Sequence, residues 1–100
     1  MRIDKWLWHT RLVKSRALAA RLCEAGMVGC RGADVPRPAL IVKPGDEVTL
    51  THAGWRRRLR VLAFGTRRGP AAEARLLYEE IAAPERVTAA DPDWENLIAL

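Results

Sequence analysis

Residues 1–28 read MRIDKWLWHTRLVKSRALAARLCEAGMV and contain two helical patterns joined by a break. At 100° per residue, one side of the first pattern carries Ile3, Trp6, Leu7 and Thr10. Asp4 falls in the first turn, where a carboxylate suits the helix dipole. Residues 1–10 are therefore predicted to form a short amphipathic helix.

A second helix is predicted to follow the break at Val13-Lys14. Ser15 is a favoured N-cap residue, and Gly26 can adopt the left-handed conformation that commonly ends a helix. Between these two positions, residues spaced at i, i+4 and i+7 form the stripe expected to be buried, namely Leu18, Leu22 and Ala25.

From Met27 onward the pattern changes to short strands and turns. Strands are predicted at residues 27–30, 47–51 and 55–64. In the second, Val48 and Leu50 alternate with polar residues and are expected to point inward; in the third, Leu59 and Val61 share one face. A turn is predicted at residues 31–34, and another at residues 43–46, where Pro precedes Gly as a type II turn prefers. The intervening residues 35–40 contain two prolines and suit an extended connection.

The C-terminal third is predicted to be helical and then acidic. Pro70 suits a first helical turn, and residues 71–81 place Leu77 and Ile81 one turn apart. A final docking turn could involve Trp94, Leu97, Ile98 and Leu100. The whole pattern predicts an α+β fold, with one domain over residues 1–68 and a C-terminal helix and acidic tail over residues 69–100.

The charge is distributed unevenly along the 100 residues, whose formal net charge is +5. Residues 1–68 hold 15 Lys and Arg against 5 Asp and Glu, whereas residues 69–100 hold 2 against 7. A basic body with an acidic tail indicates a polyanionic partner for the body. The alternative is a solvated basic surface without a partner.

Several other classes of protein are disfavoured. The longest apolar run, Ala39–Val42, is too short to cross a membrane, and no secretory signal is visible, so a cytoplasmic location is expected. Cys23 and Cys30 are separated by six residues, which matches no CxxC motif, and are expected to be reduced, buried thiols. His9 and His52 lack companions at ligand spacing. We therefore expect no metal site, no cofactor and no catalytic residue.

The strongest functional signal lies in the first sixteen residues. Five cations surround the two predicted helices and are expected to share one outer surface, namely Arg2, Lys5, Arg11, Lys14 and Arg16. Such a surface suits a phosphate backbone, because each cation can neutralise a phosphate and release counterions. Basic amphipathic helices also bind membranes or partner proteins, but these helices are short and strands follow at once.

Further residues could add to this phosphate-binding surface. The helix N-terminus at Ser15 offers oriented N–H groups to an anion. A possible second basic patch comprises Arg56, Arg58 and Arg60, which share one face of a predicted strand. Its alternative role is to keep a strand edge from aggregating. Trp8 and Trp55 could stack on bases, although a structural role is the commoner one for such side chains.

An ordered set of motifs resembles the S4-type RNA-binding domain over about residues 1–51. The set comprises RIDKWLW (residues 2–8), Arg11, Lys14-Ser15-Arg16, Ala19, Gly26-Met27-Val28, Gly32 and Lys43-Pro44-Gly45-Asp46. The N-terminal run, together with Gly69-Pro70-Ala71 and Leu77-Tyr78-Glu79-Glu80, is most similar to the ribosome-associated heat shock protein 15 family.

This resemblance implies two helices packed on a small antiparallel sheet, with RNA bound across the helical face. It also implies binding to ribosomal RNA of free large subunits that carry a stalled nascent chain on tRNA, and assistance with their recycling. The positions that match RNA-facing residues are Arg2, Lys5, Arg11, Lys14, Ser15 and Arg16; Arg31 and Arg37 are cations beside that face. A monomer is expected. Reversing the charge at Arg11 and Arg16 is expected to abolish RNA binding and leave the fold intact.

The sequence also departs from the family pattern. The turn Cys30-Arg31-Gly32 has Arg where the family usually has Asn, and the tail is acidic where relatives often have a long basic helix. Two rival functions are a general RNA- or DNA-binding module in another step of translation or RNA processing, and an RNA-modification accessory protein. Two others are a sequence-specific DNA regulator with a helix in the major groove, and an interaction module working through residues 84–100. A catalytic domain is disfavoured because only about fifty residues follow the S4-like region.

Overall fold

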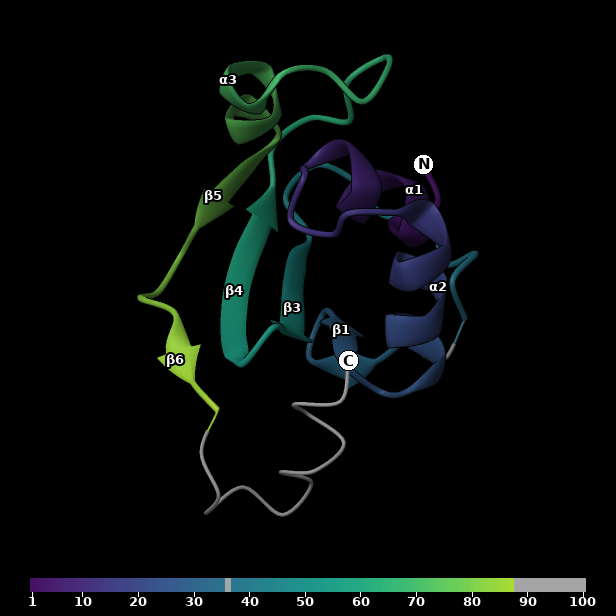
Figure 1. Ribbon diagram of the computed structural model, residues 1–100, viewed down its shortest axis with the longest axis vertical. Helices are drawn as coiled ribbons and strands as arrows, with labels where there is room; N and C mark the ends of the chain where they lie inside the picture. The colour runs from purple at the N-terminus through teal and green to yellow at the C-terminus, as the bar shows by residue number, and fades with distance from the viewer. Residues whose placement is uncertain (36, 88–100) are drawn as a thin grey trace.

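The computed structural model describes residues 1–35 and 37–87, which form an α+β fold. Its elements in chain order are α1 (Ile3–His9), α2 (Arg16–Glu24), β1 (Val28–Cys30), β2 (Ala33–Asp34), β3 (Glu47–His52), β4 (Trp55–Val61), α3 (Ala71–Ala74), the 3₁₀ helix η1 (Arg75–Leu77), β5 (Tyr78–Glu80) and β6 (Glu85–Arg86). Figure 1 shows α1 and α2 side by side against the sheet, with α3 beyond the end of β4.

The strands form one antiparallel sheet in the order β2-β1-β3-β4-β5, and β6 pairs with a different part of β4. The register of β3 on β4 places Val48 opposite Leu59 and Leu50 opposite Arg57. Val48, Leu50, Leu59 and Val61 are all buried, which confirms the inward positions predicted for this hairpin. One face of the sheet therefore supports the helices.

The N-terminal helices form the core as their patterns predict. Ile3, Trp6 and Leu7 are fully buried on α1, and Leu18 and Leu22 are buried on α2. The prediction that Ala25 is the third buried residue of the α2 stripe was wrong. Ala25 is the exposed C-cap, because the helix ends at Glu24 and Gly26 follows with φ +77°. Ala19 and Cys23 are buried instead.

Several turns are confirmed by the backbone. Gly45 has a φ of +92°, and the Asp46 N–H donates to the Lys43 carbonyl at 3.1 Å, as expected for the Pro-Gly turn. Residues 31–32 form the two-residue loop between β1 and β2, so the predicted turn is shorter than residues 31–34. Arg31 has a φ of +53° there. Arg therefore occupies a left-handed position that Asn fills more easily.

The β3–β4 loop, Ala53-Gly54, has the same geometry, with φ values of +54° and +83°. Ala53→Asn is expected to raise the free energy of unfolding by about 0.5–1 kcal/mol, because Asn adopts a positive φ at lower cost. Urea denaturation would measure this. Ala39→Asn is a matched control, since Ala39 is exposed and lies outside the left-handed region. Equal responses of the two variants would contradict the prediction.

The helix predicted over residues 71–81 was wrong beyond its first turns. Only Ala71–Ala74 is α-helical; η1 follows, and Tyr78–Glu80 then pairs with β4 as strand β5. The N–H groups of Leu62 and Ala63 both donate to the Leu77 carbonyl. The edge of β4 thus supplies hydrogen-bond partners for the backbone of residues 78–80, and this pairing replaces the helix that the spacing of Leu77 and Ile81 predicts. The strand predicted over residues 55–64 likewise ends earlier, at Val61.

The predicted docking turn at Trp94, Leu97, Ile98 and Leu100 lies outside the described residues, as does most of the acidic tail. Among the helices of the described part, none has the length and apolar character needed to cross a membrane.

Candidate nucleic-acid interface

A hollow of about 450 Å³ opens where the chain passes from α1 to α2. Its walls include four cations, Arg11, Lys14, Arg21 and Arg68, and we call this hollow the basic groove. Leu12, Leu18 and His52 complete the lining. Among residues 1–35 and 37–87, no carboxylate lines the groove, so its positive charge is not neutralised locally. The groove is therefore a site of concentrated positive potential.

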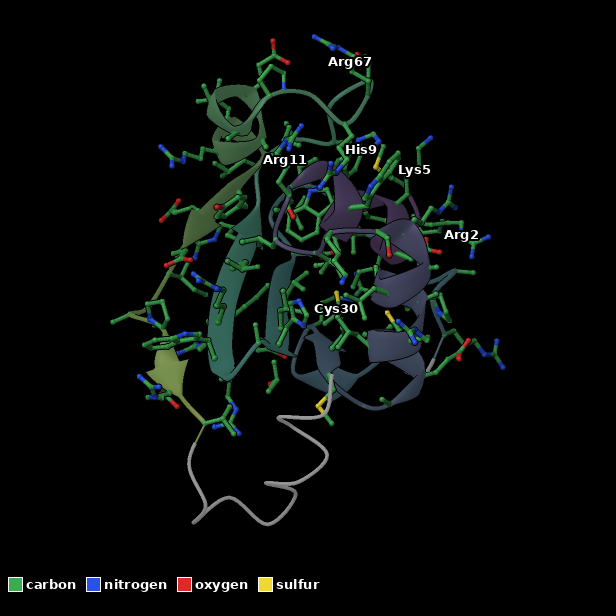
Figure 2. The ribbon with its side chains drawn as sticks, viewed as in Figure 1. Arg2, Lys5, His9, Arg11, Cys30 and Arg67 are labelled. Atoms are coloured by element: carbon green, nitrogen blue, oxygen red, sulfur yellow. The ribbon has the colours of Figure 1, made fainter. Side chains whose placement is uncertain are left out.

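Arg11 is held at the groove by its backbone and by its side chain. Its φ is +63°, a conformation that costs a non-glycine residue roughly 1–3 kcal/mol and is common at functional sites. Its N–H donates to the Trp8 carbonyl at 3.2 Å, and its Nε donates to the Gly69 carbonyl at 2.5 Å. The guanidinium is thus pre-oriented, and Figure 2 shows it on the side of α1 toward the sheet.

Arg68 reaches the groove from a distant part of the chain. Its Nε donates to the Trp8 carbonyl at 3.1 Å, and its guanidinium lies 5.7 Å from the centroid of the Trp8 ring. A cation over an aromatic face is attracted by the ring quadrupole. Trp8 therefore has a structural role here, since its ring supports Arg68.

Two more contacts fasten the segment before Arg68 to α1. The Trp6 indole Nε1 donates to the Ala63 carbonyl at 3.0 Å, and the His9 Nδ1 lies 3.0 Å from the Phe64 carbonyl. A carbonyl can only accept, so His9 carries its proton on Nδ1 in this contact. Because both side chains are buried, the segment is held in place and Arg68 is kept beside Arg11.

Arg2 and Arg16 do not join the groove but converge on Asp4. Arg2 donates to both Asp4 oxygens at 3.2 and 3.1 Å, and the Arg16 Nε lies 3.5 Å from Asp4 Oδ2. The Lys5 N–H also donates to this carboxylate, which is only 3% exposed. The common surface expected for the five N-terminal cations is therefore divided: Arg2 pairs with Asp4 at the start of α1, Arg16 joins α2 to that carboxylate, and Arg11 and Lys14 line the groove.

The remaining predicted residues have separate surroundings. The Ser15 hydroxyl accepts from the Leu18 N–H at 3.1 Å, so it caps α2 as predicted. Arg31, in the β1–β2 loop, pairs at 2.6 Å with Asp46 of the turn that precedes β3. Lys5 is half-buried and Arg37 is exposed, and among the described residues neither forms an ion pair. The structure thus brings only Arg11 and Lys14 of the predicted set into the basic groove.

Comparisons with known proteins identify the family of this chain. Residues 1–48 match the S4 domain family. The solved trimeric structure of Vibrio cholerae heat shock protein 15 superposes with a TM-score of 0.77 at 34% identity, over 82% of this chain and 82% of that chain. The chain belongs to the heat shock protein 15 family. Escherichia coli heat shock protein 15 is 43% identical over 82 residues, 82% of this chain.

The S4 relatives extend beyond heat shock protein 15. The Bacillus subtilis RQC P-site tRNA stabilizing factor is 40% identical over 50 residues, which is 50% of this chain and 57% of that protein. The present chain spans 61% of the length of the E. coli heat shock protein 15. The Vibrio cholerae relative is described as trimeric, and the monomeric state expected for this chain stays a prediction.

In this member of the heat shock protein 15 family, the possible second basic patch is paired with carboxylates. Three arginines on the outer face of β4 each meet a glutamate: Arg56 with Glu85 at 3.7 Å, Arg58 with Glu47 at 2.7 Å and Arg60 with Glu79 at 3.4 Å. Such exposed pairs contribute about 0–1 kcal/mol each to stability. Their positive charge is largely cancelled locally, unlike that of the basic groove.

Sequence reasoning missed Arg21 and Arg68 as groove residues. Arg21 lies almost two helical turns after Lys14, and its place near the edge of the apolar stripe was the available signal. Arg68 belongs to a basic run of the sequence together with Arg67, but nothing local places it beside α1, because its position depends on contacts with Trp8 about sixty residues away. Leu12, an apolar residue among cations, was also missed.

Both cysteines are free and buried, as expected. Burial is the main cause that raises the pKa of the Cys23 thiol to about 11, and the nearby Asp4 and Glu24 carboxylates add to the effect. Burial also raises the pKa of the Cys30 thiol. Both thiols are therefore protonated at neutral pH and pack as small apolar groups. Among the described residues, no cluster of His, Cys, Asp and Glu could hold a metal ion.

Proposed function

We propose that this protein binds ribosomal RNA of the large ribosomal subunit, that its target subunits retain peptidyl-tRNA of a stalled nascent chain, and that it assists their recycling under stress in the cytoplasm. The names of its relatives support this proposal, since they include a heat shock protein and a P-site tRNA stabilizing factor. Its role in the complex is binding without a chemical step.

The observation that carries the proposal is the basic groove, with four cations and no lining carboxylate among the described residues. Each Lys or Arg that meets a phosphate releases condensed counterions, and this release favours binding. Such contacts position RNA without reading its sequence. Because Arg11 and Arg68 are fixed by hydrogen bonds to carbonyls, the groove presents two of its four charges at set positions. Charges at set positions select RNA by shape.

The test is cosedimentation with purified large subunits, prepared with and without peptidyl-tRNA. We expect more protein to pellet with subunits that retain peptidyl-tRNA. If four phosphates are contacted, affinity should fall by about 100-fold between roughly 50 and 200 mM salt. Small subunits and duplex DNA of equal phosphate concentration serve as competitors. Equal binding to all of these polyanions would contradict the proposal and indicate a general polyanion-binding surface.

A further inference from the structure

A second, smaller hollow of about 220 Å³ adjoins the basic groove. Arg11, Leu12 and His52 line both, so the two hollows share a wall of side chains. The smaller one reaches the β3–β4 hairpin, where Trp55 and Arg57 line it. A continuous surface depression therefore leads from the start of α2 to the tip of this hairpin.

The two ends of this depression differ in chemistry. The first end carries the four cations of the basic groove, whereas the hairpin end adds the apolar side chains of Leu50, Ala53 and Trp55. Arg57 is present at this end, but its guanidinium pairs with Glu80. A ligand that fits both ends must combine negative charge with a flat, weakly polar group.

Trp55 is a fixed aromatic surface at the hairpin end. It begins β4 opposite His52, and its backbone also pairs with Arg86 of β6, while the Val87 N–H donates to the Gly54 carbonyl. The side chain is 38% exposed, and the Arg86 guanidinium lies 5.5 Å from the ring centroid. Because the hairpin is held from both sides, stacking on this ring would require little loss of conformational freedom.

Resting on the proposed function, we propose that the hairpin end of the depression receives one unpaired RNA base, which stacks on Trp55 while neighbouring phosphates lie against Arg11 and Lys14. Every base has a π face that can stack on an aromatic side chain, so this contact tolerates different bases. A base within a duplex is already stacked on its neighbours and cannot reach the ring. The protein is thereby expected to prefer RNA with an unpaired nucleotide beside a helix.

The test compares two RNA hairpins with the same stem, one with an unpaired 2-aminopurine bulge and one fully paired. We expect Trp55→Leu, which keeps apolar bulk but removes the ring, to weaken binding of the bulged RNA roughly tenfold and leave the paired RNA unchanged. Trp55→Phe should retain most of the affinity. Wild-type protein should quench the 2-aminopurine fluorescence on binding, and Trp55→Leu should not.

Leu62→Ala is the matched control, because Leu62 is an exposed apolar residue of the segment that follows β4 and does not line the depression. Thermal melts verify that each variant is folded. The stacking proposal would be overturned if Trp55→Leu bound the bulged RNA and quenched its fluorescence as wild type does. An equal loss of affinity for the bulged and the paired RNA would also overturn it. If wild-type protein bound neither hairpin nor large subunits, the proposed function itself would fail. If wild-type protein and Trp55→Leu bound both RNAs equally well, the proposed RNA-binding function would still hold and only the stacking on Trp55 would be rejected.

Discussion

Replacing Arg11 and Lys14 together by Gln is expected to lower the affinity for large-subunit RNA by about 100-fold near 0.1 M salt, since a charged contact contributes roughly 1.5 kcal/mol or more. Both side chains line the basic groove, where no described carboxylate offsets their charge. The plot of log affinity against log salt should also become shallower by about 1.5–2 units, because two fewer phosphates release counterions. Fluorescence anisotropy across a salt series would measure both effects.

The matched control is the double variant Arg58→Gln, Arg60→Gln. It removes the same two positive charges, but from arginines that pair with Glu47 and Glu79 on the other face of the sheet. We expect its affinity to stay within about threefold of wild type, since distant charges act only through a screened field. Equal losses in the two double variants would mean that net charge, and not the basic groove, governs binding.

The double variant combines Arg11 with Lys14, and leaves Arg16 unchanged, for a structural reason. The expectation that Arg16 could be reversed without affecting the fold does not fit its contact with the buried Asp4 carboxylate at 3.5 Å. A glutamate at position 16 would place two carboxylates side by side at the α1–α2 contact. Lys14 is exposed and, among the described residues, forms no ion pair, so its neutralisation tests RNA binding without disturbing that contact.

Asp4→Ala is expected to lower the free energy of unfolding by about 2–3 kcal/mol, a large share of the stability of a small domain. The substitution removes the acceptor of Arg2, Arg16 and the Lys5 N–H. Arg2 and Arg16 keep partial access to water, with side chains 47% and 42% exposed, so the loss should fall below that of a fully buried pair. Urea denaturation followed by circular dichroism would measure it.

Glu24→Ala is the control for Asp4→Ala, because Glu24 is an exposed carboxylate at the end of α2 and should change stability by less than about 0.5 kcal/mol. RNA affinity of folded Asp4→Ala protein is expected to stay within about threefold of wild type, since Arg2 and Arg16 lie outside the basic groove. Full stability of Asp4→Ala would contradict the structural role of this cluster. A large rise in RNA affinity would instead indicate that Asp4 restrains two RNA-binding arginines.

Some features could be predicted because they depend on neighbours in sequence. The α1 stripe is correct, since Ile3, Trp6 and Leu7 meet at helical spacing whatever surrounds them. The Ser15 cap is correct because its partner, the Leu18 N–H, is three residues away. The turn at residues 43–46 is correct for the same local reason.

Other features could not be predicted because their partners are distant. The segment at residues 78–80 has helical spacing but becomes a strand, since the open edge of β4 supplies hydrogen-bond partners that no local pattern reveals. The role of Asp4 was underestimated for a related reason. The favourable contact of Asp4 with the helix dipole depends on α1 alone, whereas its partner Arg16 lies on α2.

Local sequence patterns are enough to predict the α+β class, the two N-terminal helices with their cap, and the excess of positive charge in the first two thirds of the chain. Which cations lie together depends on the folded chain. The folded chain pairs Arg2 and Arg16 with Asp4, balances the β4 arginines with glutamates, and brings Arg21 and Arg68 beside Arg11 and Lys14. The physical reason is that charges interact through space, over distances that sequence spacing does not record.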